Sequence, residues 1–443
     1  MGSSSASRAA PDTIVVGGGV IGLAVAEELA RRGARVRLFE RGRPGGEASW
    51  AAGGMLAAEY EFESAGPFQV LAFRSRAMWP AYAERLGADY GTDVRLRTEG
   101  ALAPAFDEPA LAKLHARLDG RSFGGRVEWL DARALRDAEP SLAPAVLGAA
   151  WLRDDLVCEN RALLFALQRA ARKLGVEIHS DSPVAIRVES GRVRGVVAGA
   201  QAIDADLVIN AAGAWASAIA ELPGHPALYP VRGQMLGFHT DQPDALRHVV
   251  RWDDGYAIPR SAGRIVVGST VEPDSGFTKA VTPEAVARLT TGIATALPGL
   301  AVERRLAWSG LRPATSDELP LLGAMTGVDG YLLAAGHYRN GILLTPVTAS
   351  AIADLAEGKT PAIDLAAFAP SRASLAAGSI IVNGASRALR PGTTVRGLLS
   401  ELLLERPGVA VAVNEEVVRR GDWDRTVLTR NDRVEIIHAV GGG

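Results

Sequence analysis

A short β-branched run that leads into closely spaced glycines constrains the fold of this chain more than any other feature. Residues 13–22 read TIVVGGGVIG, and a helical pattern follows over residues 23–32. This order of strand, glycine turn and helix is typical of the first unit of a dinucleotide-binding sheet. Gly17 allows the tight turn, Gly19 lets the backbone approach a pyrophosphate, and Gly22 permits close packing of the helix, whose N-terminus faces the phosphates.

A second strand supports this interpretation. Residues 34–39 read ARVRLF and are followed by Glu40, which lies where an acid that binds a ribose is expected. In an unrelated α/β unit with a tight structural turn, the position of Glu40 would be a coincidence. The pattern therefore predicts a dinucleotide site, but its spacing does not distinguish NAD from FAD.

Length and composition limit the remaining possibilities. A chain of 443 residues predicts two or three domains of roughly 150 residues each. The net charge of -2 is that of a protein whose partners are small molecules or proteins, not nucleic acid. The single cysteine, Cys158, excludes an intramolecular disulfide and a multi-thiolate zinc site. Residues 1–10 predict a disordered tail, and no apolar run is long enough to span a bilayer, so we expect a cytoplasmic protein without a membrane partner.

Three later segments predict that the nucleotide-binding domain is discontinuous. Residues 48–55 read ASWAAGGM, and their small side chains would let the backbone approach a flat ring. Residues 206–215 read DLVINAAGAW, which is again a strand followed by a tight turn. Residues 330–344 read GYLLAAGHYRNGILL, a strand that enters a glycine-bracketed polar turn.

With these segments the chain resembles the FAD-dependent D-amino acid oxidase superfamily, and within it the glycine oxidases, over about residues 11–368. The resemblance rests on VVGGGVIG, FER, AAGGM, NAAGAWA, GLRPATSDELPLLG and AAGHYRNGILL. It implies a Rossmann-like FAD-binding domain with a substrate domain built on an antiparallel sheet, and residues 253–270 alternate polar and apolar side chains as strands of such a sheet do. The FAD-binding segments are expected at about 11–75, 145–225 and 305–368, and the substrate domain at about 76–144 and 226–304.

The resemblance also implies which residues bind the substrate. Arg312 is expected to bind the carboxylate of an amino acid with two parallel hydrogen bonds, and Tyr256 to donate its hydroxyl to the same group. Arg339 is placed beside substrate and flavin, and Met55 and Val271 along the pocket. Val271 replaces a bulkier methionine of the glycine oxidase pattern, so glycine, sarcosine and small D-amino acids all remain possible substrates.

The cofactor implied is non-covalent FAD, since no cysteine lies in the matching turns. We do not assign His337 as a general base, because a neutral amine needs only hydride transfer and a lone histidine in a turn is more often structural. The next helix either has Thr345 as N-cap and Pro346 as first residue, or begins near Gly341 as the resemblance implies. The residues expected to contact FAD are Gly17, Gly19, Val20, Ile21, Gly22, Glu40, Arg41, Ala48, Ser49, Gly53, Gly54, Met55, Val184, Gly213, His337, Tyr338, Arg339, Asn340, Gly341, Ile342 and Leu343.

A second domain is predicted at residues 378–443, after a linker at 369–377. A hairpin around Asn383-Gly384, a helix within 393–404 capped by Thr393 or Thr394, and strands at 409–413 and 433–437 give the order ββαββ. This order, with NDRVEI and the terminal Gly442 and Gly443, resembles the β-grasp, ubiquitin-like sulfur carrier of thiamin biosynthesis. The other interpretation is an oligomerisation module, in which the glycines would have no purpose. The fold class expected is therefore α/β plus α+β.

Together the two resemblances imply a bifunctional protein of thiazole assembly. One half would oxidise glycine to its imine with dioxygen, forming hydrogen peroxide, and the other would carry sulfur as a thiocarboxylate on Gly443. The partners implied are thiazole synthase and an ATP-dependent adenylating enzyme, and we expect a homo-oligomer. The alternatives are a catabolic sarcosine or D-amino acid oxidase fused to a molybdopterin-type carrier, and a carrier with a degenerate oxidase. The intact Arg312, Tyr256 and glycine turns argue against degeneracy.

Overall fold

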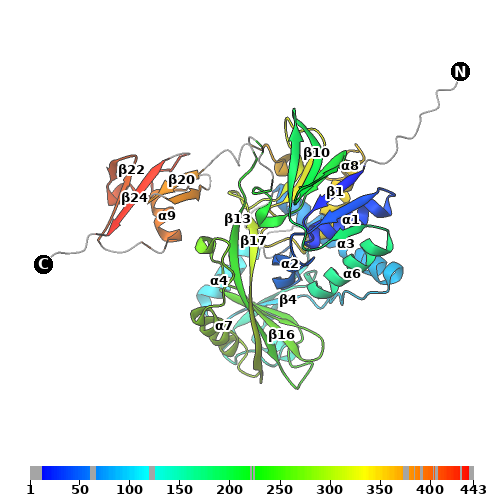
Figure 1. Cartoon of the computed structure of the whole chain (residues 1–443). Helices are drawn as coiled ribbons and strands as arrows, with labels where there is room; N and C mark the ends of the chain where they lie inside the picture. The colour runs from blue at the N-terminus through cyan, green and yellow to red at the C-terminus, as the bar shows by residue number, and fades with distance from the viewer. Residues whose placement is uncertain are drawn as a thin grey trace.

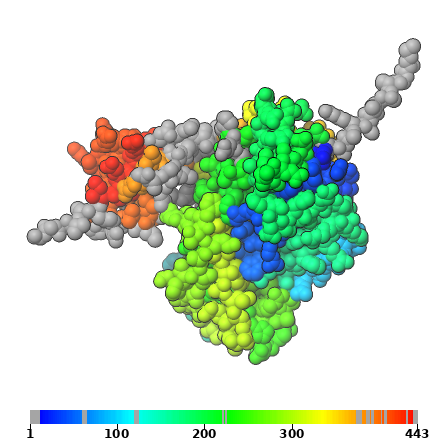
Figure 2. Space-filling view, viewed as in Figure 1, coloured from blue at the N-terminus to red at the C-terminus, as the bar shows by residue number. Residues whose placement is uncertain are grey.

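The computed structural model describes residues 12–59, 66–118, 125–219, 222, 225–372, 379–383, 385–389, 393–402, 404, 408–429 and 432–438. Within these residues the strands form sheets of six, three, eight and five strands and one two-stranded ladder. Figure 1 shows the C-terminal strands and α9 (Val395–Glu401) at one side of the larger body, and Figure 2 shows them as a separate group of orange-to-red atoms. Among the described residues, no helix has the length and apolar character needed to cross a membrane.

The six-stranded sheet carries the glycine turn of the N-terminus. Its order is β18-β19-β12-β1-β2-β8, and all neighbours are parallel except β18 and β19. Every residue of β1 is buried, as expected for a strand covered on both faces. The strands are β1 (Thr13–Val16), β2 (Val36–Phe39), β8 (Glu177–His179), β12 (Leu207–Asn210), β18 (Leu321–Ala324) and β19 (Tyr331–Ala335).

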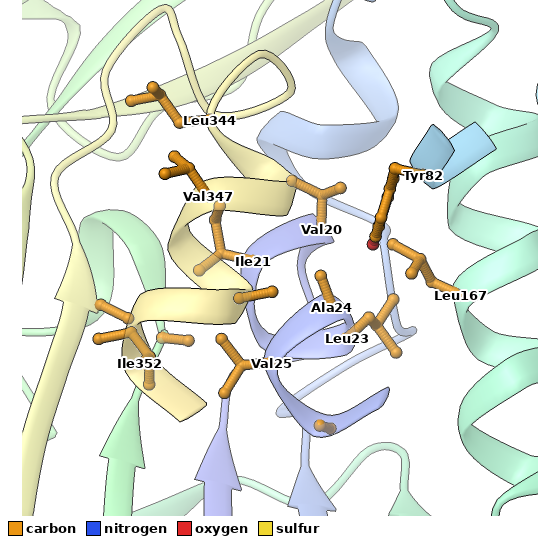
Figure 3. Packing of buried hydrophobic residues seen from close by; sticks show 14 of the residues in the cluster. Val20, Ile21, Leu23, Ala24, Val25, Tyr82, Leu167, Leu344, Val347 and Ile352 are labelled. Carbon is orange, nitrogen blue, oxygen red and sulfur yellow. The ribbon is translucent and has the colours of Figure 1, made fainter. Parts of the chain in front are cut away.

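Helices cover one face of this sheet and a small sheet covers the other. The helices of the first face are α1 (Val20–Arg31), α3 (Pro67–Tyr90), α6 (Asn160–Lys173) and α8 (Thr345–Ala356), and their apolar residues form one core with Val15 and Leu38. Figure 3 shows α1 side chains such as Ile21 and Val25 directed at Val347 and Ile352 of α8. The other face packs against β9 (Val184–Glu189), β10 (Arg192–Ala198) and β11 (Gln201–Asp204).

The predicted strand, turn and helix are therefore confirmed, with shifted ends. The helix begins at Val20, three residues before the predicted start, because the glycine turn is shorter than the apolar pattern suggests. The second strand begins at Val36 and not at residue 34. Boundaries of this kind depend on capping contacts that periodicity does not report.

The eight-stranded sheet supplies the second wall of the molecule's main cavity. Its order is β17-β13-β16-β15-β14-β4-β6-β5, and only β14 and β4 are parallel. One face packs against α5 (Ala132–Ala138) and α7 (Pro283–Ala296) through Leu135, Leu289 and Ile293. The strands are β4 (Ala101–Ala105), β5 (Val127–Asp131), β6 (Gly148–Leu152), β13 (Tyr229–His239), β14 (Val249–Trp252), β15 (Gly255–Pro259), β16 (Arg264–Gly268) and β17 (Glu303–Ala314).

The strands β6 and β17 lie in this sheet although the resemblance assigns most of their residues to the FAD-binding segments. The domain boundaries therefore stay a prediction. The remaining elements of this part are α2 (Ala48–Ala51), α4 (Glu108–Leu118) and the ladder of β3 (Met55–Leu56) with β7 (Leu156–Val157). Short 3₁₀ turns lie at Gly213–Trp215, Pro273–Ser275 and Ala366–Phe368.

The C-terminal sheet has its own core. Its order is β21-β20-β24-β22-β23, and α9 packs on it through Val395, Leu398 and Leu399. Thr394 is the N-cap of α9, and its hydroxyl accepts a hydrogen bond from the Gly397 N–H at 3.1 Å. The strands are β20 (Ser379–Val382), β21 (Ala385–Ala388), β22 (Val409–Val413), β23 (Glu416–Val418) and β24 (Arg433–His438), with a 3₁₀ turn at Arg420–Asp422. The predicted fold class is confirmed, and β23 is an additional strand.

Candidate active site

A cavity of about 1450 Å³ lies between the six-stranded sheet and one face of the eight-stranded sheet. The carboxyl ends of β1 and β12 reach it with Val16, Gly17 and Ala211, and β13 and β17 reach it with Met235 and Arg312. The carboxyl ends of parallel strands are where α/β sheets usually bind ligands. The volume exceeds the ~300–1,000 Å³ of a common small-molecule pocket, so the space suits an extended ligand together with a small one.

The glycine turn explains why its positions lack side chains. Gly17 has φ +105°, and a Cβ there would lie 2.5 Å from the Ala211 carbonyl oxygen. A Cβ on Gly22 would overlap the Gly17 carbonyl oxygen, whereas a Cβ on Gly19 would meet only the Ser49 hydroxyl, at 3.3 Å. Gly17 and Gly22 therefore hold the turn together, and Gly19 leaves the N-terminus of α1 open to a ligand.

Arg312 lies on the opposite wall, and oxygen atoms of a neighbouring segment fix its guanidinium. Its Nη1 donates to the Thr270 carbonyl oxygen at 3.0 Å, and its Nη2 donates to the Ser269 hydroxyl at 2.7 Å. A Cβ on Gly233 would overlap the guanidinium, so the glycine provides its space. Arg312 is half-buried at the cavity wall, where it can bind an anion.

Tyr256 lies on β15, on the face of the sheet that borders the cavity. Its hydroxyl lies 3.5 Å from the sulfur of Met235, and a Cβ on Gly53 would lie 3.5 Å from the same hydroxyl. A glycine at position 53 therefore lets the residues after α2 lie close to the tyrosine ring. Tyr256, Gly53 and Arg312 all line one space.

The turn before α8 closes the end of the cavity. Tyr338 has φ +46°, and its N–H donates to the Pro313 carbonyl oxygen at 2.8 Å, which joins this turn to β17. The His337 ring is buried and lies 3.1 Å from the Thr348 hydroxyl. Burial lowers the pKa of His337 to about 3, so the ring is neutral at physiological pH and has a structural contact.

The start of α8 agrees fully with neither prediction made for it. Turns precede the helix, because the Leu344 N–H donates to the Asn340 carbonyl oxygen at 2.9 Å. The helix itself begins at Thr345 with Leu344 as N-cap, so the prediction of Thr345 as N-cap is wrong. The Thr345 hydroxyl donates backwards to the Gly341 carbonyl oxygen at 2.9 Å, which makes it part of the first turn.

The family is decided by comparison with known proteins. Residues 12–355 match the family model described as FAD dependent oxidoreductase. The chain belongs to this family. A glycine oxidase of Geobacillus kaustophilus is 38% identical over 367 residues, which are 82% of this chain and 97% of that protein. The crystal structure of glycine oxidase from Geobacillus kaustophilus has a TM-score of 0.77 at 37% identity and covers 82% of this chain and 98% of its own.

Two further similarities concern a bifunctional relative and the second domain of this FAD-dependent oxidoreductase. A Bifunctional protein ThiO/ThiG of Synechocystis is 35% identical over 370 residues, which are 82% of this chain and 54% of that protein. Residues 380–443 match the ThiS family model. The oxidoreductase therefore joins an FAD-dependent domain to a ThiS domain, as predicted.

The nucleotide side of the cavity fits FAD. Glu40 accepts hydrogen bonds from the Gly18 N–H at 2.7 Å and the Gly42 N–H at 2.9 Å, one on each carboxylate oxygen. Each oxygen retains a lone pair for a ribose hydroxyl, because a carboxylate has about four acceptor sites. The Arg41 guanidinium lies 3.5 Å from the centre of the Trp215 ring, at the edge of the same cavity.

Most residues predicted for the site of the oxidoreductase line this one cavity, including Met55 and Arg339. Gly22 does not, because it packs behind the turn against Gly17. Leu343 does not either, since its carbonyl oxygen accepts hydrogen bonds from Trp79 at 2.9 Å and Ser75 at 2.7 Å on α3. Gly442 and Gly443 lie outside the described residues. The predicted residues that line the cavity are Gly17, Gly19, Val20, Ile21, Glu40, Arg41, Ala48, Ser49, Gly53, Gly54, Met55, Val184, Gly213, Tyr256, Val271, Arg312, His337, Tyr338, Arg339, Asn340, Gly341 and Ile342.

Sequence reasoning placed Val271 at the pocket but missed the neighbouring residues that support Arg312. Ser269, Thr270 and Glu272 line the cavity, and Glu272 accepts from Arg232 Nε at 2.7 Å and from Gln234 at 2.8 Å. Burial raises the pKa of Glu272, but hydrogen bonds from Thr270, Arg232 and Gln234 outweigh it and lower the pKa overall. The polar residues that alternate along β13 were the available signal.

Proposed function

We propose that this chain oxidises glycine to its imine and carries sulfur for the same thiazole ring of thiamin. Two findings support the proposal: the similarity to glycine oxidases over most of the chain, and the ThiS domain that follows. The similarity to the Bifunctional protein ThiO/ThiG supports a place in the same pathway. The observation that carries the oxidase half is Arg312, held by two oxygen atoms on a cavity that also contains the glycine turn.

Arg312 binds the substrate carboxylate in this proposal. Thr270 and Ser269 restrict the guanidinium, so little side-chain entropy is lost when the substrate binds. Tyr256 donates its hydroxyl to the same carboxylate in exchange for its contact with Met235. Met55 and Val271 border the α-carbon, and Arg339 closes the side of the turn that precedes α8.

FAD, when bound, would supply the acceptor for a hydride from the α-carbon of the neutral amine and the route by which two electrons reach dioxygen, which gives hydrogen peroxide. Glycine loses one proton and one hydride and becomes the imine, which water converts to glyoxylate and ammonia if it is not used. The chain needs no general base for this step. His337 therefore has a structural role in this proposal, because its ring is neutral, buried and in contact with Thr348.

The C-terminal half carries sulfur as a thiocarboxylate on Gly443. An adenylating enzyme activates the carboxylate with ATP, a sulfur donor displaces AMP, and thiazole synthase takes the sulfur. The ThiS family model extends to residue 443, which supports this assignment. The division into an oxidase at 11–368, a linker at 369–377 and a carrier at 378–443 is part of the proposal, as are a homo-oligomer and a cytoplasmic location.

The oxidase half is tested with the purified full-length protein. We expect flavin absorbance and hydrogen peroxide production, with the highest kcat/KM for glycine among glycine, sarcosine and D-alanine. A preparation without flavin, or one that leaves all three amines unchanged, contradicts the proposal. A strong preference for sarcosine or D-alanine would favour a catabolic oxidase.

The carrier half is tested by intact-mass spectrometry after incubation with ATP, a sulfur donor and the cognate adenylating enzyme. We expect a mass gain equal to the replacement of one oxygen by sulfur. The matched control lacks only Gly443 and should show no gain. A gain that persists in this control would place the sulfur elsewhere.

A further inference from the structure

A second cavity, of about 420 Å³, lies on the same face of the eight-stranded sheet as the large one. The proposed function does not use it. Gly237, Val266 and Leu306 are neighbours across β13, β16 and β17 and form its floor. The first residues of α6 and the end of α2 form its sides, through Glu159, Asn160, Arg161 and Ala52.

Positive charge exceeds negative charge in this cavity. Four arginines line it (Arg161, Arg260, Arg264 and Arg305), against the single carboxylate Glu159. Glu159 pairs with Arg264 at 3.1 Å, and Arg305 pairs with Glu303 at 2.6 Å. Within the described part of the chain, Arg161 and Arg260 have no carboxylate within ion-pair distance and contact only carbonyl oxygens and rings.

The environment of these two arginines confirms that their charge is poorly compensated. Burial lowers the pKa of Arg260 to about 10, and burial together with the nearby Arg264 lowers the pKa of Arg161. Both guanidiniums remain charged near neutral pH. An anion placed between them would therefore be stabilised by two positive groups without a carboxylate partner.

Apart from Asn160 and His239, the rest of the cavity is apolar and aromatic. The Arg161 guanidinium lies 3.6 Å from the centre of the Trp50 ring and 5.1 Å from that of Trp308. A Cβ on Gly237 would lie 3.2 Å from the Trp308 ring and 3.3 Å from Leu306 Cβ, so the glycine leaves these side chains room. Leu306 is 55% exposed and offers an apolar contact at the surface of this cavity. A ligand that fills this space needs an apolar body as well as a charge.

We propose that this cavity is a second ligand site, which binds a small organic anion with an apolar or aromatic body. The anionic group would lie between Arg161 and Arg260, and the body would pack on Leu306, Val266 and Trp308. The residues and charges of this cavity are observed in the structure without reference to the proposed reaction, so this proposal does not depend on the proposed function.

The second cavity shares a wall with the large cavity, so a ligand bound there can affect the residues of the oxidase site. Ala52 lines both cavities. Arg260 donates to the Gly53 carbonyl oxygen, and the Trp308 Nε1–H donates to the Ala51 carbonyl oxygen at 3.0 Å. A ligand that packs on Trp308 therefore contacts a side chain that holds Ala51, two residues before Gly53.

The test is a titration of the full-length, FAD-containing protein with phenyl phosphate, followed by calorimetry and by fluorescence of the tryptophans. Phenol and inorganic phosphate, each lacking one part of the probe, should bind more weakly. Arg161→Gln should weaken phenyl phosphate at least about tenfold, because it removes a charge-assisted contact. Arg161→Lys keeps the charge and should recover part of the affinity.

Two matched controls locate the binding. Arg133→Gln, on the exposed side of α5, should bind phenyl phosphate as the unchanged protein does. Arg312→Gln should also bind normally, since Arg312 belongs to the other cavity. Loss of binding in Arg312→Gln, or equal binding in Arg161→Gln, overturns the proposal. Absence of phenyl phosphate binding to the unchanged protein also overturns the proposal. If Leu306→Glu then forms a smaller oligomer, this face is a subunit interface.

Discussion

Neighbouring residues of the protein orient the Arg312 guanidinium before a substrate binds. This orientation determines the expected effect of replacing Arg312 by lysine. The Thr270 carbonyl oxygen accepts a hydrogen bond from its Nη1 and the Ser269 hydroxyl accepts one from its Nη2. Lysine at this position keeps the charge but cannot donate two parallel hydrogen bonds. We expect Arg312→Lys to raise the KM for glycine about 10- to 100-fold with a smaller change in kcat. Steady-state kinetics measure this, with Arg133→Lys as control, and an unchanged KM would contradict it.

Asp155 is a buried carboxyl that the proposed chemistry does not use. Its Oδ1 accepts from the N–H groups of Ala58 at 3.0 Å and Glu59 at 3.3 Å. Its Oδ2 has no hydrogen-bond partner among the described residues. Burial is the main cause that raises the pKa of Asp155 to about 7, with a smaller contribution from the Glu59 charge, against the opposing effects of the Arg251 and Arg76 charges and of the Glu59 N–H hydrogen bond. Compared with the unfolded chain, the folded protein therefore favours the protonated form of the Asp155 carboxyl.

The raised pKa of Asp155 makes its contribution to the free energy of unfolding depend on pH. Because the folded pKa lies above the unfolded one, the stabilisation is complete below pH ~4 and is lost as the pH rises to about 7, at about 1.4 kcal/mol per pH unit. An asparagine at this position would resemble the protonated acid and does not titrate. We expect Asp155→Asn to melt several degrees higher than the unchanged protein at pH 8, with the gap closing towards pH 4. A gap that is constant with pH would show that Asp155 does not titrate in this window.

At the scale of elements, the glycine turn and α1 form one unit in which Gly22 is the tightest contact. A Cβ there would overlap the Gly17 carbonyl oxygen, which is backbone and cannot move without the turn. We expect Gly22→Ala to lose bound flavin and to melt at a lower temperature. The matched control is Gly87→Ala within α3, where the nearest heavy atom would be 4.0 Å away. Alanine should there be neutral or stabilising by about 1 kcal/mol. Flavin retention in Gly22→Ala would contradict this account.

Local pattern was enough to predict the elements whose signals lie within a few residues. The β1 turn and α1, the strands β15 and β16, and the helix α9 with its threonine cap follow from periodicity and capping residues. β23 was missed because its hairpin turn is Asn414-Glu415, where both residues have positive φ without a glycine to mark the turn. The placement of β6 and β17 depends on pairing between distant strands, and that pairing leaves no local mark.

The same limit applies to the site. Arg312, Tyr256, Gly17 and Gly19 were found from motifs, and each lines the cavity as its motif suggests. The support of Arg312 by Ser269 and Thr270 comes from another part of the sheet, and sequence spacing does not show it. Leu343 lies within a motif, yet its carbonyl oxygen is directed at Trp79 and Ser75, because α3 packs behind the turn. A motif therefore predicts which segment lies at the site better than which atom faces it.

At the scale of the whole molecule, the two halves have separate cores. The C-terminal core contains Val395, Leu399 and Trp423. The last described residue before it is Arg372, which binds Asp317 through two contacts of 2.7 Å. Arg372 and Ser379 are seven residues apart, so they can lie no farther from each other than roughly 25 Å. A tether of this length keeps the carrier near the oxidase at an effective concentration in about the millimolar range.

This concentration predicts how the fusion behaves towards a shared partner. We expect the intact chain to support thiazole formation faster than a mixture of its two halves, divided within residues 373–378, when both are micromolar with thiazole synthase and the adenylating enzyme. The advantage should disappear as the halves approach the effective concentration, and it should decline slowly when Gly/Ser residues lengthen the linker. An intact chain without Gly443 controls for the carrier step. Equal rates at micromolar concentration would mean that the fusion fixes only the ratio of the two halves, because proximity would then contribute nothing to delivery.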